Sequence, residues 1–175
     1  HIAVVRSSGG CKLYIDGSQV GSEWEITADL NPSYSDYFRI GDNGYGLFAN
    51  IDEFRISKGI ARWTSDFTPP TSPYDNGERG ADSNTLLLMH MNDDLFLDAS
   101  GRHTVEIYND AATNDSDKKW GAASFDVTGT GDYLLVSDSD DWSFGTSDFT
   151  IEAQLKLPSG VSNADCGILG TYVKN

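Results

Sequence analysis

The chain has 175 residues, of which 38 % are hydrophobic and 18 are glycine, and its formal net charge at pH 7 is −15. This length suits one domain with a hydrophobic core. The negative charge argues against partners such as nucleic acid or anionic membrane surfaces, which require basic patches. The longest apolar run, 86–91, is far below the ~20 residues of a membrane-spanning helix, so we expect no membrane insertion.

Short alternating segments separated by turns begin at the N-terminus. Residues 2–5 form an apolar run, and the next segment places Cys11, Leu13 and Ile15 on one face of a predicted strand. A tight turn follows at Asp16-Gly17. Residues 24–30 are ambiguous between strand and loop, and 37–40 are predicted to be a strand.

The IDEFRIS segment is the next predicted strand. Its alternation places Asp52 on the same face as Phe54, and therefore toward a core. An inward carboxylate must be hydrogen-bonded, paired or bound to a metal. The sequence leaves open whether Asp52 caps loop amides, pairs with an arginine such as Arg39 or Arg62, or binds calcium.

The middle of the chain departs from this pattern. Residues 59–63 are expected to form one helical turn, and the three prolines at 69, 70 and 73 indicate an irregular extended segment. Residues 75–84 are predicted to be a linker. The apolar segment 85–91 then indicates a central strand, and 105–108 a short one.

The clearest strand is 149–157. Phe149, Ile151, Ala153 and Leu155 alternate with polar residues, which is typical of a strand with one face in a core and one in water. An apolar run at 133–136 precedes it. Short alternating strands with almost no helical periodicity predict an all-β protein.

At these residues the chain shows a family resemblance. WGAASFDVTGTGDYLLV followed by SDDWSFGTSDFTIEA resembles the laminin-G-like, concanavalin A-like lectin/glucanase jelly rolls of phage and bacterial surface proteins. The resemblance implies an antiparallel two-sheet jelly roll. In that family the segments like DASG, GDY and DFTIEA come first, and those like HIAVV, LYIDG, IDEFRIS and FTPP come last. The order here is rotated, so 1–74 is expected to be the closing half, 75–84 a linker and 85–175 the opening half.

Two arrangements of these halves remain open. They can form one permuted sandwich, or belong to two tandem copies completed by sequence outside the chain. In the first arrangement the strand 149–157 shares one core with Leu13, Ile15, Phe54 and Ile56.

The resemblance implies a non-catalytic carbohydrate-recognition or adhesion module, extracellular or on a virion surface. Its expected partners are glycans or cell-surface polysaccharide, and neighbouring domains or subunits of a larger assembly. The alternative is a structural spacer or decoration domain. A glycoside hydrolase is less expected, because the fold's glucanases place two Glu around an Asp at alternate positions, where this chain has Asn50, Asp52 and Phe54.

Glycan binding requires exposed aromatic faces beside carboxylates and amides. Each candidate aromatic residue also suits a core. The candidates are Trp24, Tyr37, Asp42, Asn43, Tyr45, Asp140, Asp141 and Trp142.

The resemblance also places Asp52 beside Asp98 of the DASG turn at a structural Ca²⁺ in many such sandwiches. Oxygen ligands of this kind suit calcium. The two cysteines, Cys11 and Cys166, are too few for a disulfide framework, and the sequence leaves their pairing open.

Overall fold

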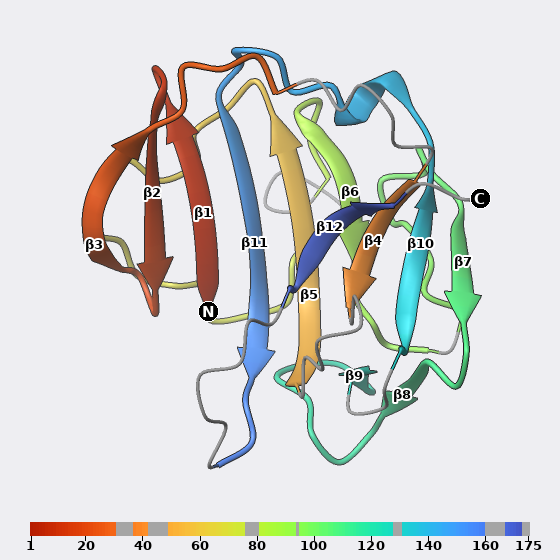
Figure 1. Cartoon of the computed structure of the whole chain (residues 1–175). Coiled ribbons are helices and arrows are strands. Elements are labelled where there is room, and N and C mark those ends of the chain that lie inside the picture. The colour runs from red at the N-terminus through yellow and green to blue at the C-terminus, as the bar shows by residue number, and fades with distance from the viewer. Residues whose placement is uncertain are drawn as a thin grey trace.

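The computed structural model describes residues 1–30, 37–41, 49–75, 81–93, 95–127, 131–159 and 167–172. Within these ranges the chain forms two antiparallel sheets that face each other as a β-sandwich (Figure 1). The described part contains a single 3₁₀ turn, η1 (Asp140–Trp142), no α-helix, and no helix able to span a membrane. The predicted all-β class is confirmed, whereas the jelly-roll connectivity stays a prediction.

The larger sheet has eight strands in the order β3-β2-β1-β11-β5-β9-β8, with β6 also paired to β5. Their bounds are β1 (Ile2–Ser7), β2 (Gly10–Ile15), β3 (Ser18–Glu25), β5 (Ala49–Lys58), β6 (Thr85–Met89), β8 (Ala112–Asn114), β9 (Ser124–Val127) and β11 (Phe149–Lys156).

The smaller sheet has four strands in the order β12-β4-β10-β7. Their bounds are β4 (Tyr37–Gly41), β7 (Val105–Tyr108), β10 (Tyr133–Ser137) and β12 (Leu169–Tyr172). The core lies between the sheets, where Phe38 and Ile40 of β4 join Phe54 and Ile56 of β5 in one buried cluster.

Strands from distant parts of the sequence alternate in both sheets. β11 pairs with β1 on one side and β5 on the other, so that Ile151 lies opposite both Val4 and Ile56. In the smaller sheet, β4 lies between β10 and β12. The segments before and after residues 75–84 therefore build the same two sheets.

The predicted shared core is only partly correct in its residues. Phe149 joins Phe54 and Ile56 in the buried cluster between the sheets. Leu13 lies outside the buried clusters, and Ile15 is 47 % exposed. The prediction for these two residues was wrong, because β2 and β3 extend beyond β12, the outermost strand of the smaller sheet (Figure 1).

A bulge in β5 reverses the alternation that the sequence predicted. Glu53 has a φ of 49°, and two residues of β5 lie opposite the single residue Ala153 between the pairs Arg55↔Glu152 and Asp52↔Gln154. Such an extra residue shifts the following side chains to the other face. Ile51 therefore joins the core, and Asp52 lies on the outer face of the larger sheet, contrary to the prediction.

Candidate binding pocket

The segment 59–75 crosses the outer face of the larger sheet. Its prolines lack the amide donors that a strand needs, so the segment cannot extend the sheet as a further ladder. It is fixed by hydrogen bonds instead. The Phe67 N–H donates to the Gly17 carbonyl at 2.9 Å, and the Arg62 N–H donates to Thr150 Oγ1 at 2.9 Å.

Apolar packing also holds this segment. Trp63 and Phe67 stack with ring centroids 3.9 Å apart, and they cover Ala3, Val5 and Tyr14 of the outer face. The segment thus has a small core of its own on the side of the sheet that faces away from the smaller sheet.

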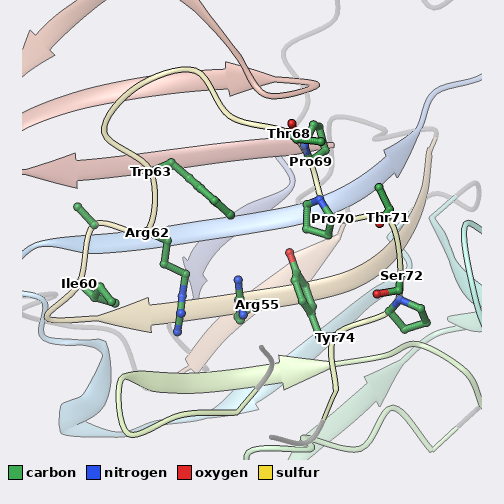
Figure 2. Close-up of a pocket in the computed structure, with 12 residues that line it drawn as sticks. Arg55, Ile60, Arg62, Trp63, Thr68, Pro69, Pro70, Thr71, Ser72 and Tyr74 are labelled. Atoms are coloured by element: carbon green, nitrogen blue, oxygen red, sulfur yellow. The ribbon is translucent and has the colours of Figure 1, made fainter. Parts of the chain in front are cut away.

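Beneath 59–75 lies a pocket of about 550 Å³, a size typical of small-molecule sites. Figure 2 shows Arg55 on β5 as part of its floor, with side chains of the crossing segment around it. We call it the proline pocket. It is lined by Arg55, Ile60, Ala61, Arg62, Trp63, Thr68, Pro69, Pro70, Thr71, Ser72, Pro73 and Tyr74.

The buried carboxylate of Glu152 orients the aromatic side chains of the proline pocket. Arg55 donates to its Oε1 through Nη2 at 2.6 Å and Nε at 3.0 Å. The Tyr74 hydroxyl donates to Oε2 at 2.8 Å, and the Trp63 indole N–H lies 3.4 Å from the same oxygen. Because bonds to charged groups are the stronger kind, this network holds both rings in place.

Tyr74 is the most firmly held of these groups. The Arg55 guanidinium lies 4.0 Å from the centre of the Tyr74 ring. The backbone N–H of Tyr74 donates to Glu53 Oε2 at 2.9 Å. Burial and the neighbouring charge of Glu152 raise the pKa of Tyr74 far above its ordinary value. The phenol therefore stays a neutral hydrogen-bond donor.

The second guanidinium in the lining, that of Arg62, is also paired. Its Nη2 donates to both oxygens of Asp82 at 2.9 Å, and its Nε donates to Ser57 Oγ at 2.8 Å. Burial alone would raise the pKa of Asp82, but hydrogen bonds from Arg62 and Thr85 outweigh it and lower the pKa. The described lining of the proline pocket therefore offers the partly exposed ring of Trp63 and polar edges, with both guanidiniums compensated by carboxylates.

The residues predicted to bind glycans lie elsewhere. Trp24, on the edge strand β3, is 41 % exposed, and Tyr37 lies on β4 of the other sheet. Asp140 and Asp141 are in η1, where Asp141 is 3.3 Å from His103 Nε2. Asp42, Asn43 and Tyr45 lie outside the described residues, as does Cys166; Cys11 is buried.

Trp142 does not offer the exposed face that a sugar platform needs. It is only 3 % exposed, stacks on Phe38 with ring centroids 4.9 Å apart, and donates its indole N–H to the Ser137 carbonyl at 2.9 Å. Trp142 therefore takes the core alternative that the sequence left open for each candidate aromatic residue.

The two carboxylates predicted to bind calcium accept hydrogen bonds from backbone amides. Asp52 Oδ2 accepts from Lys119 and Trp120 at 2.9 Å, which is the loop-capping alternative that the sequence left open. Asp98 accepts from several amides, among them Leu88 and His103 at 3.0 Å. Within the described part no group of three or more His, Cys, Asp or Glu could hold a metal ion. Calcium binding stays a prediction, in which the ion must compete with these donors.

Sequence reasoning missed the proline pocket. The sequence predicted one helical turn at 59–63, where the structure has no helix, and irregular chain after it, whereas two aromatic residues, Trp63 and Tyr74, flank the prolines there. A segment that is rich in prolines and still carries large aromatic residues is a signal that it packs against something. No protein-family model, curated protein or solved structure matches the chain.

Proposed function

We propose that the protein is a non-catalytic carbohydrate-recognition module and that the proline pocket is its binding site. The observation that carries this proposal is the fixed, partly exposed indole of Trp63 beside guanidinium and hydroxyl groups in one pocket, where Tyr74, 6 % exposed, forms a buried wall. Sugars present apolar C–H faces and a rim of hydroxyls, and a site of this composition complements both.

The compensated charges favour a neutral sugar. Arg55 is paired with Glu152 and Arg62 with Asp82, so neither guanidinium is reserved for an anionic ligand. Arg62 can still donate through Nη1, because its hydrogen bonds to described residues use Nε and Nη2. The proposal includes the setting that the resemblance implies, a secreted or virion surface protein that contacts cell-surface polysaccharide, and a permuted jelly-roll connectivity for the sandwich.

The composition of the proline pocket supports binding without hydrolysis. Glycosidases of the usual kind need two carboxyl groups on either side of the scissile bond. The described lining contains neither Asp nor Glu, and the nearby Glu152 is occupied by Arg55, Tyr74 and Trp63. We therefore place the protein among binding modules.

A glycan array tests the proposal with one matched pair of variants. Ser72 and Ser65 are both exposed on the crossing segment, but only Ser72 lines the proline pocket. Ser72→Trp should fill the pocket and abolish the array signal, while Ser65→Trp should keep it. A wild-type signal that both variants retain would exclude the proline pocket as the site, and a silent wild type would contradict the function.

A second candidate function, assembly with a neighbouring subunit, has its own observation. Apolar side chains of β1, β2 and β3 share one face of the larger sheet. Leu13 is the cross-strand partner of both Val4 and Val20, and Cys11 is the partner of Trp24. Toward the β3 edge this face is exposed, with Val20 at 44 % and Trp24 at 41 %. Contiguous exposed apolar surface is typical of interfaces. If this function holds, sedimentation should show self-association that Trp24→Glu abolishes.

A further inference from the structure

A second pocket lies on the same outer face of the larger sheet. It has a volume of about 280 Å³, and its walls include Asn50 and Asp52 of β5 and Gln154 of β11. Asp52 and Gln154 are cross-strand partners at the bulge. We call it the amide pocket, after Asn50 and Gln154.

Its walls carry buried polar atoms that have no hydrogen-bond partner in the part of the chain that the structure describes. Besides His1 Nδ1, they include Asp52 Oδ1, Asn50 Nδ2 and Gln154 Nε2 of the two sheet strands. The three residues are 3 %, 8 % and 5 % exposed. Buried polar atoms are nearly always paired, because an unpaired one loses its bonds to water and gains nothing in return. Three of them line one cavity, where a bound molecule can supply the missing partners.

The side-chain charges of lysine and aspartate around the amide pocket balance, apart from the terminal ammonium of His1, which pairs with Asp16. Three lysines, at 118, 119 and 156, face three carboxylates, at 16, 52 and 117, and Lys156 pairs with Asp117. A phosphate would lack a surplus of cations, and the described residues hold no cluster of three potential metal ligands. The unpaired atoms of Asp52, Asn50 and Gln154 are one acceptor and two donors, and His1 Nδ1 accepts or donates according to its tautomer, which suits a neutral molecule with both kinds of group.

We propose that the amide pocket binds a neutral polyhydroxyl ligand, a sugar or a sugar-like diol. One ligand hydroxyl donates to Asp52 Oδ1, and the side-chain amides of Asn50 and Gln154 donate to neighbouring hydroxyl oxygens. Burial raises the pKa of Asp52 against the opposing amides of Trp120 and Lys119, so the carboxyl is poorly solvated and gains from such a donor.

The two pockets are adjacent through Glu152. Its Oε2 contacts His1 Nε2, in the wall of the amide pocket, at 3.1 Å, and it bonds to Trp63 and Tyr74 of the proline pocket. The inference rests on the proposed function only in the choice of a sugar as the class of ligand. The location of the amide pocket and its unpaired atoms do not depend on it. The two sites can therefore be tested separately.

The test uses ¹⁵N-labelled protein and neutral methyl glycosides of glucose, mannose and galactose. At least one glycoside should shift the side-chain amide resonances of Asn50 and Gln154. Gln154→Met keeps the side chain's length and removes the donor, so it should weaken binding at least about tenfold. It should also leave the melting temperature equal or higher, since it removes an unpaired buried amide. Gln19→Met, on the exposed strand β3, is the control and should change neither property.

Four results would overturn the inference: no glycoside shifts either amide, Gln154→Met binds as well as Gln19→Met, Gln154→Met melts lower, or calcium chloride alone produces the shifts. If Ser72→Trp abolishes the array signal and the amides of Asn50 and Gln154 never respond, the proposed function stands and the amide pocket is excluded. If the amides respond and the array is unaffected by Ser72→Trp, the amide pocket stands and the proline pocket is excluded.

Discussion

Glu53 shows how one residue connects the bulge, the crossing segment and a titratable partner. Its positive φ produces the bulge in β5, and its buried carboxylate accepts from the Tyr74 N–H and lies 3.0 Å from His90 Nδ1. A residue other than glycine rarely adopts a positive φ without compensating contacts. Here the compensation is the pair of contacts that its side chain makes.

The Glu53–His90 pair gives a pH dependence of stability. The hydrogen bond that His90 donates to Glu53 raises the pKa of His90, although burial opposes it. A raised histidine pKa stabilises the fold fully below the unfolded pKa of ~6.5, and this stabilisation is lost as pH rises through the folded pKa. We expect the free energy of unfolding to fall over that window in wild type and to vary less in His90→Gln. The free energy of unfolding is measured by urea titration at several pH values. An equal change of this free energy with pH in the two proteins would contradict the prediction.

Asp52 gives a pH dependence of the same sign in a more acidic window. Burial raises its pKa, so the folded state binds the proton more tightly and stability decreases as pH rises from ~3.9 to the folded pKa. Asn can still accept from the amides of Lys119 and Trp120. We therefore expect Asp52→Asn to match or exceed wild-type stability at pH 7, by up to about 1 kcal/mol.

Asp98→Asn is the matched control for that substitution. Both oxygens of Asp98 accept hydrogen bonds, so an amide nitrogen at either position would face a donor. We expect a loss of about 1–3 kcal/mol in chemical denaturation. If Asp52→Asn lost as much as Asp98→Asn, Oδ1 of Asp52 would have a structural partner in solution.

At the scale of elements, the turn between β2 and β3 holds the crossing segment. Gly17 has a φ of 81°, and a Cβ there would lie 1.9 Å from the Phe67 carbonyl oxygen. Gly21, with a φ of 72°, has no atom within 4 Å of such a Cβ. We expect Gly17→Ala to lower the free energy of unfolding by at least ~1 kcal/mol more than Gly21→Ala. Equal losses would mean that the segment does not pack on this turn.

The elements also show which parts of the fold the sequence could predict. The strand at 149–157 was predicted because its alternation is uninterrupted, and β7 coincides with the predicted 105–108. In β5 the alternation of faces breaks at Glu53. The sequence could not predict this, because no local signal marks the extra residue of the bulge. Trp142 and Trp24 have similar polar neighbours in sequence, and only the position of the smaller sheet decides which is buried.

The candidate site was beyond prediction for a related reason. The proline pocket joins Arg55 of β5 to residues 60–74 and depends on Glu152 of β11, which is distant in sequence. Each part alone resembles an ordinary strand or an irregular connection. The unpaired atoms of the amide pocket likewise come from two strands that meet only in the folded sheet.

At the scale of the whole molecule, the interleaved strands predict cooperative unfolding. β11 lies between β1 and β5, so removing either partner exposes one of its edges and one face of the core. We expect a single calorimetric transition whose van't Hoff and calorimetric enthalpies agree. Two separate transitions would indicate that the segments before and after the linker fold independently.

The central claim is that a neutral glycan binds beside Trp63, under the crossing segment. The direct measurement is the indole N–H spectrum of the protein during titration with a glycan found on the array, because the four tryptophans lie in different places. We predict that the Trp63 resonance, whose N–H faces Glu152, shifts with ligand while those of Trp24 and Trp142 stay unchanged. A shift of Trp24 with Trp63 unchanged would contradict the account and place binding on the exposed face of β3.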